Sequence, residues 1–175
     1  MSGINQIQMS FSPTEDRILL RMNTMDSTSF QFWLTRRYVK LLWPVLLTML
    51  TKDEQITSQQ SDQAKQEVLS FQHQEAAQNM DYSKEYQAET QQQPLGTEAI
   101  LLGKIAANQR EDGTQILSMH PENGQGIELA LNQILLHSIC KLLQDTVAKT
   151  DWDIDLSRSL IPASSTFDIK SKAIN

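Results

Sequence analysis

The sequence predicts an α+β protein built from two copies of a strand–strand–strand–helix unit. Apolar residues alternate with polar ones in several short segments, which is the period of a strand with one buried face. In two places such a strand runs directly into a segment with the helical period. These two places are related by a constant shift of 97 residues without a gap. A chain of 175 residues has room for one compact domain or two small ones.

The first unit occupies residues 1–50. Strands are expected at 4–12, 17–24 and 30–34, separated by turns at Ser12–Asp16 and Met25–Thr28. Thr35 can cap the helix that follows, because its hydroxyl accepts hydrogen bonds from free N–H groups of the first turn. The helix has one broad apolar face, made of Tyr38, Val39, Leu42, Val45, Leu46, Met49 and Leu50. Pro44 lies inside this helix and predicts a kink, because it removes one backbone donor and crowds the carbonyl of Lys40.

The middle segment, residues 51–96, is rich in Gln, Ser and Glu. Ala64, Val68 and Phe71 are spaced by four and three residues, which predicts a weakly amphipathic polar helix. Tyr82–Pro94 contains three consecutive glutamines and has no hydrophobic period. We therefore expect it to be a mobile linker between the two units.

The second unit occupies residues 97–149. Strands are expected at 99–107, 114–119 and 127–131, and Asn132 can cap a helix that runs to about residue 148. Gly113 and the Asn123–Gly124 pair mark the two turns. Residues 150–175 alternate Trp152, Ile154 and Leu156 with aspartates before Pro162, and we expect an irregular tail.

The shift of 97 residues places equivalent positions of the two units on one another. Phe30, Phe32 and Leu34 fall on Ile127, Leu129 and Leu131, and Thr35 falls on Asn132. Each unit alone would have a thin core for its length. We therefore expect the two units to pack about a pseudo-twofold axis into a single domain, with both helices covering antiparallel sheet.

Charge is distributed unevenly along the chain. The net charge is −6 and the isoelectric point is about 5.0. Residues 1–50 carry five Lys/Arg against three Asp/Glu, whereas residues 51–100 carry three against nine. An acidic chain is a poor binder of phosphate backbones in bulk, although a local basic patch remains open.

Cysteine content and hydropathy indicate a cytoplasmic protein without a membrane span. Cys140 is the single cysteine, so no intramolecular disulfide can form, and its apolar helix predicts a buried, inert thiol. Residues 1–5 do not resemble a secretory signal. The most apolar window, Leu41–Leu50, is shorter than the roughly 20 residues that cross a bilayer.

The candidate binding residues are Arg36, Arg37, Lys40 and Trp43. Arg36, Lys40 and Trp43 share a stripe of the first helix away from its apolar face. A cationic stripe with an aromatic side chain suits base stacking with phosphate contact, or an acidic partner helix. The alternative is a solvated helix flank whose long side chains cover Trp43. The equivalent residues of the second helix are Gln133, His137 and Cys140, so a site here would belong to the first unit only.

No pattern in the sequence indicates catalysis, a metal or a cofactor. His73, His120 and His137 lack the spacing of a zinc site. Asp151, Asp153 and Asp155 lack the glycine and the terminal glutamate of a calcium loop. No phosphate-binding loop, nucleophile elbow or His-Glu-x-x-His motif occurs. We expect a non-catalytic protein with no cofactor.

Two runs resemble those of a family of uncharacterised bacterial proteins. They are Phe-Trp-Leu-Thr-Arg-Arg-Tyr at 32–38, continued by Leu-Leu-Trp at 41–43, and Gly-Gln-Gly-Ile-Glu-Leu at 124–129. The resemblance covers both units but not the Gln-rich middle, and it implies no activity. The element order is also similar to that of PUR-repeat nucleic-acid-binding proteins, whose repeat is several strands followed by a helix. This chain has three expected strands per unit and lacks a basic sheet.

Three functional hypotheses follow. The first is a non-catalytic cytoplasmic binding or adaptor protein that acts through protein–protein contacts. The second is a single-stranded nucleic-acid-binding protein of tandem-repeat type, which the net charge disfavours. The third is a small acidic chaperone, suggested by size and acidity.

Overall fold

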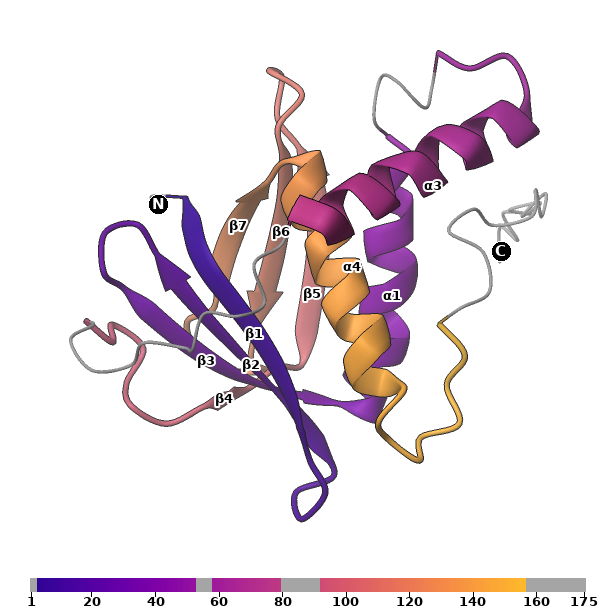
Figure 1. The fold of residues 1–175 in the computed structure, drawn as a ribbon. Coiled ribbons are helices and arrows are strands. Elements are labelled where there is room, and N and C mark those ends of the chain that lie inside the picture. The colour runs from indigo at the N-terminus through magenta and orange to yellow at the C-terminus, as the bar shows by residue number, and fades with distance from the viewer. Residues whose placement is uncertain (1–2, 53–57, 80–91, 157–175) are drawn as a thin grey trace, which may run out of the picture.

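The computed structural model describes residues 3–52, 58–79 and 92–156, and it shows a mixed α+β fold with two sheets. Figure 1 shows the two sheets on one side of the paired helices α1 and α4, with α3 lying across this pair. Most of the predicted linker at 82–94 and the tail beyond residue 156 lie outside the described residues. Gln92, at the end of the predicted linker, forms a parallel bridge with Thr28.

The first sheet contains four strands in the order in which they occur in the chain. β1, β2 and β3 are antiparallel, and the short β4 lies parallel to β3 through Phe32 and Trp33. Their bounds are β1 Ile4–Ser12, β2 Arg17–Thr24, β3 Ser29–Thr35 and β4 Ile100–Leu101. The three strands predicted for the first unit are therefore confirmed.

The second sheet is antiparallel and consists of β5 (Lys104–Gln109), β6 (Gln115–His120) and β7 (Ile127–Leu131). The prediction of one strand over 99–107 is wrong, because this segment divides at Gly103 between the two sheets. The N–H of Gly103 donates to the His120 carbonyl at 2.9 Å. A Cβ at this position would lie 2.7 Å from the Glu122 carboxylate, so a larger residue would require this exposed side chain to move.

The two core helices have equivalent bounds. α1 is Arg36–Leu50 and α4 is Gln133–Val147, each of 15 residues. The predicted caps are confirmed, since the Thr35 hydroxyl accepts from the Tyr38 N–H at 3.2 Å and the Asn132 side chain accepts from the Leu135 N–H at 2.8 Å. α1 continues through Pro44, and the kink there stays a prediction.

Each core helix packs against the sheet of the other half. α1 contacts β5 of the second sheet, α4 contacts β1 of the first, and the two helices contact each other. The shift of 97 residues relates β1 to β5 and α1 to α4, so these two contacts are equivalent. One hydrophobic cluster includes side chains from both sheets and from all three helices. The strand–strand–strand–helix pattern is thus present in each half, and each helix contacts both halves, since α1 also contacts β3 and α4 also contacts β7.

The polar middle helix predicted around 64–71 is present as α3 (Asp62–Asn79), which packs on α4. Its predicted apolar face is confirmed only in part, because Val68 packs against the core but Phe71 is 67% exposed and Leu69, outside that face, is completely buried. Leu69 lies one position beyond Val68 on the helix, and contact with α4 selects this side. The predicted spacing followed intrahelical periodicity alone, which does not show where a neighbouring helix packs.

The described part of the tail has no regular secondary structure, as predicted, but it is packed on the fold. Trp152 is 1% exposed, and its ring lies edge-on to Phe11 with centroids 5.7 Å apart. The Trp152 indole N–H donates to the carboxylate of Asp16 in the β1–β2 turn. The Gln144 side chain of α4 donates to the Leu156 carbonyl at 2.9 Å. These contacts attach the tail to both halves.

Candidate functional site

The candidate surface is the outward side of α1, here called the α1 flank. All its residues are exposed: Arg36, Arg37, Lys40, Leu41, Pro44 and Thr48. Leu41, at 45% exposure, is one of the few large apolar side chains that face solvent. The structure therefore brings three of the four predicted site residues, Arg36, Arg37 and Lys40, onto one exposed surface.

The fourth predicted residue, Trp43, is only 8% exposed, so the prediction of an exposed aromatic on this helix is wrong. α1 is contacted by α4, β5 and β3, and these neighbours bury a wider arc of the helix than its apolar face alone indicated. Val45 was expected on the buried face and is only partly buried. The apolar side chains that the flank does offer, Leu41 and Pro44, were not identified from the sequence.

The α1 flank is cationic. α1 contains Arg36, Arg37 and Lys40 and no acidic residue. Cations at a helix N-terminus are unfavourable because the peptide dipoles place partial positive charge there. Within the described parts of the chain, no ion pair involves these three side chains, whereas Arg17 lies 3.7 Å from Glu15 and Lys65 lies 3.7 Å from Asp62. An anionic group would therefore meet unneutralised positive charge on this surface.

The equivalent side of α4 is covered at two positions, although Ile134, which corresponds to Arg37, is 58% exposed. His137 and Ser138 are 1% and 3% exposed, although they correspond to the exposed Lys40 and Leu41 of α1. α3 accounts for the difference, because it packs on α4 and places Gln72 Oε1 3.4 Å from Nε2 of His137. His137, on the flank of α4, is buried for this reason.

Cys140 and Tyr38 are buried groups whose pKa values are raised, so both stay protonated near neutral pH. Burial raises the pKa of the Cys140 thiol to about 12, and the side chain is fully buried, which confirms the expected buried thiol. Burial also raises the pKa of Tyr38 above its usual value of 10.0. The Tyr38 hydroxyl donates to the Lys104 carbonyl at 3.3 Å, which ties the start of α1 to β5.

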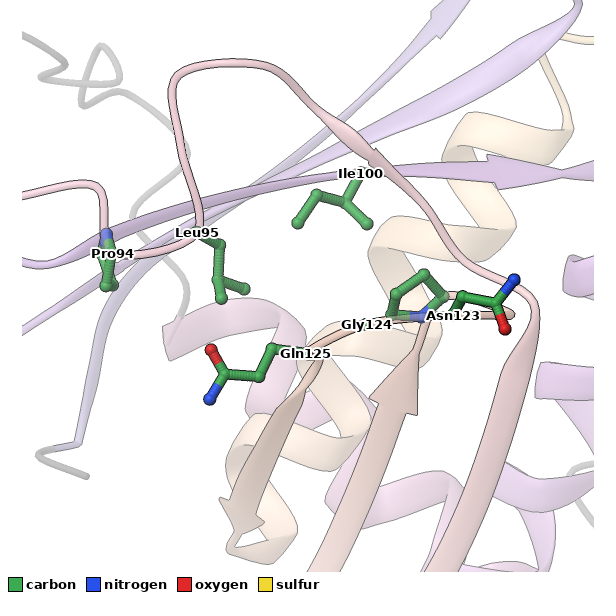
Figure 2. A pocket seen from close by; sticks show the side chains of 7 residues that line it. Pro94, Leu95, Ile100, Asn123, Gly124 and Gln125 are labelled. Atoms are coloured by element: carbon green, nitrogen blue, oxygen red, sulfur yellow. The ribbon is translucent and has the colours of Figure 1, made fainter.

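A shallow hollow of about 390 Å³ lies between the segment that leads into β4 and the turn before β7. Figure 2 shows Leu95 and Ile100 on one side of it, facing Asn123, Gly124 and Gln125 of the turn. Its lining is completed by Pro94 and Pro121, so the hollow contains no ionisable side chain. It offers no nucleophile, acid or base to a bound molecule.

Within the described residues, no three His, Cys, Asp or Glu side chains gather as metal ligands would. In the same part of the chain, no helix combines the length and hydrophobicity that crossing a membrane requires. Comparisons with protein-family models, with curated proteins and with solved structures found no significant match. The α1 flank is therefore the surface on which a functional argument rests.

Proposed function

We propose that this protein is a non-catalytic binding or adaptor protein that contacts a partner protein through the α1 flank. The observation that carries this proposal is the exposure of three cations and Leu41 on a helix whose opposite side is fully buried. The proposed setting is the cytoplasm of a bacterium, which the resemblance to bacterial proteins and the single buried cysteine support.

Folding places the positive charges of Arg36 and Arg37 in the first turn of α1, where the peptide dipoles disfavour them. A cation in the first turn of a helix is typically unfavourable by about 0.3–1 kcal/mol, and α1 has two arginines there. Neither Arg36 nor Arg37 has a carboxylate partner among the described residues. A partner that supplies carboxylates would relieve this repulsion, and arginine forms bidentate contacts with them. Leu41 and Pro44 would add apolar contact at the centre of the interface.

Cross-linking in the source organism tests this proposal. Lys40 is the one lysine of the flank, and Lys104 and Lys149 are exposed lysines elsewhere on the fold. With an amine-reactive reagent, we expect Lys40 to be cross-linked to a partner protein and the other two lysines to give few such links. Partner cross-links confined to Lys104 or Lys149, or no partner at all, would contradict the proposal.

A second candidate function is binding of single-stranded nucleic acid, which the cluster of Arg36, Arg37 and Lys40 favours. The stacking side chain expected for it is not on the flank, because Trp43 is buried. Titration of a labelled single strand at low and high salt separates the two candidates. Micromolar binding that weakens steeply with salt supports the nucleic-acid function, and no binding at low salt removes it. No structural observation favours the small-chaperone hypothesis.

A further inference from the structure

The contact between α3 and α4 shows which kind of element can pack on a core helix of this fold. α3 packs on α4, Leu69 of α3 is completely buried, and Gln72 of α3 lies 3.4 Å from the buried His137. Figure 1 shows α3 lying across the helix pair near the start of α4. The contact is a helix-on-helix contact in which a polar helix contributes one buried leucine.

The α1 flank stands at the equivalent place of the other half. The shift of 97 residues relates His137 to Lys40, Ser138 to Leu41 and Lys141 to Pro44. The two helices start directly after equivalent caps, have the same length and pack on each other's sheets, so equal positions face equal directions. The exposed Lys40 and Leu41 therefore stand where α4 is covered at His137 and Ser138, whereas the Lys141 side chain, at the position of Pro44, is 34% exposed.

We propose that the α1 flank binds an acidic amphipathic helix of a partner protein, packed on α1 as α3 packs on α4. This inference rests on the proposed function and specifies the chemistry of the partner. The occupant contributes an apolar side chain to the surface of Leu41 and Pro44. Its carboxylates contact the cations Arg36, Arg37 and Lys40.

The spacing of the flank residues suits a helix. Arg36, Lys40, Pro44 and Thr48 follow one another at intervals of four, and Arg37 and Leu41 form the adjacent row. Rows at this interval are the ridges between which side chains of a second helix insert. By this geometry, one apolar side chain of a partner helix can insert between the row of Lys40 and Pro44 and the row of Leu41.

The positive charge of the α1 flank indicates which kind of segment binds there. α1 has three cations and no acid, whereas α4 contains the internally paired Lys141 and Asp145. Residues 157–175 of this chain carry three Lys/Arg and one Asp, the same sign as the flank, which argues against them as occupant. α3 of a second copy is acidic, with three Asp/Glu and one Lys, but its Leu69 is already buried on α4. A separate acidic helix has the opposite charge and is the occupant we propose. Residues 80–91 of this chain are also acidic, with three Asp/Glu and one Lys, so an intramolecular cross-link from Lys40 to Lys84 would overturn the proposal.

The test uses the full chain and a synthetic probe. The probe is a lactam-bridged peptide with the sequence of residues 62–79, whose helicity is first established by circular dichroism. We expect saturable binding in the micromolar range by fluorescence anisotropy, with amide NMR shifts concentrated at residues 36–48. Arg37→Glu in the protein should weaken binding at least tenfold. Replacing Glu67 and Glu75 of the peptide by glutamine should weaken it at least threefold.

The same binding assay includes a control variant, and several of its outcomes would overturn the inference. Lys149→Glu changes an exposed cation away from the flank and should leave binding within twofold of the parent protein. Absence of binding by the helical probe, or shifts confined to residues 133–147, would overturn the inference. Intramolecular cross-links from Lys40 to Lys170 or Lys172 in the free protein would place its own tail on the flank and also overturn it. Cross-links from Lys40 to a partner without binding of the probe would overturn this inference and leave the proposed function standing.

Discussion

The side-chain amide of Gln115 donates a hydrogen bond of 2.6 Å to the main-chain carbonyl of Met49, and this contact is buried. Met49 is in the last turn of α1, and its carbonyl also accepts from the Lys52 N–H at 3.2 Å. Gln133 similarly donates to the Leu50 carbonyl at 3.3 Å. Both glutamines belong to the second half of the chain, so the second half completes the hydrogen bonding of the helix of the first.

Replacing Gln115 by methionine should lower the free energy of unfolding by about 0.5–1.5 kcal/mol, because the Met49 carbonyl would lose the shorter of its two hydrogen bonds. Urea denaturation of the parent and the variant measures this difference. Gln133→Met is the matched control, and its effect should be smaller because the contact is longer and partly exposed. Equal losses for both variants would refute the importance assigned to Gln115.

The buried side of α1 should respond to truncation, and the flank should not. Leu46 is completely buried, so Leu46→Ala should cost about 2–5 kcal/mol. Leu41 is 45% exposed, so Leu41→Ala should change stability by less than about 0.5 kcal/mol. Chemical denaturation of the two variants is the measurement. A large loss for Leu41→Ala would show that the flank is part of the core.

Trp152 should behave as a core residue although it lies outside every regular element. Trp152→Ala removes the contact with Phe11 and the donor to Asp16, and it should cost about 3–5 kcal/mol. Thermal and urea unfolding test this value. Asp151→Ala, next to it and exposed, is the control and should be nearly neutral. A loss below about 1 kcal/mol for Trp152→Ala would mean that the tail segment adds little to the fold.

Alkaline pH should destabilise the fold through Cys140. Its folded pKa is raised by burial to about 12 from an ordinary value near 9.0, so the unfolded chain releases the thiol proton first. This contribution is fully present below pH 9 and is lost as pH rises toward 12, with a limiting slope of about 1.4 kcal/mol per pH unit. Denaturation of Cys140→Ala and the parent protein at a series of pH values should show a shallower decline in the variant. Parallel declines would contradict the assignment.

Much of the fold could be predicted because its signals are local. The period change at Thr35 and at Asn132 places the start of each helix, since an alternating strand ends and a capping side chain stands between. The division at Gly103 could not be predicted in this way. It depends on parallel pairing of Ile100 with Phe32 and on the approach of Glu122, and both are contacts between residues distant in sequence.

The candidate site was predicted in part for a related reason. The exposure of Arg36, Arg37 and Lys40 follows from their position opposite the apolar face of α1. The burial of Trp43 and Leu69 depends on which neighbouring elements reach each helix, and helical periodicity does not contain this information. Trp152 is a large aromatic side chain flanked by aspartates, and this pattern was a signal that the side chain is buried. Its burial was not predicted, because the surrounding residues indicate an irregular tail.

The central claim is that the α1 flank serves binding and not folding. The most direct measurement combines a melting curve with capture of the partner for the double variant Arg36→Gln, Lys40→Gln. The account predicts an unchanged melting temperature, since exposed charges contribute little to stability, together with a loss of most of the captured partner. Loss of folding in the double variant, or unchanged folding with undiminished capture, would contradict it.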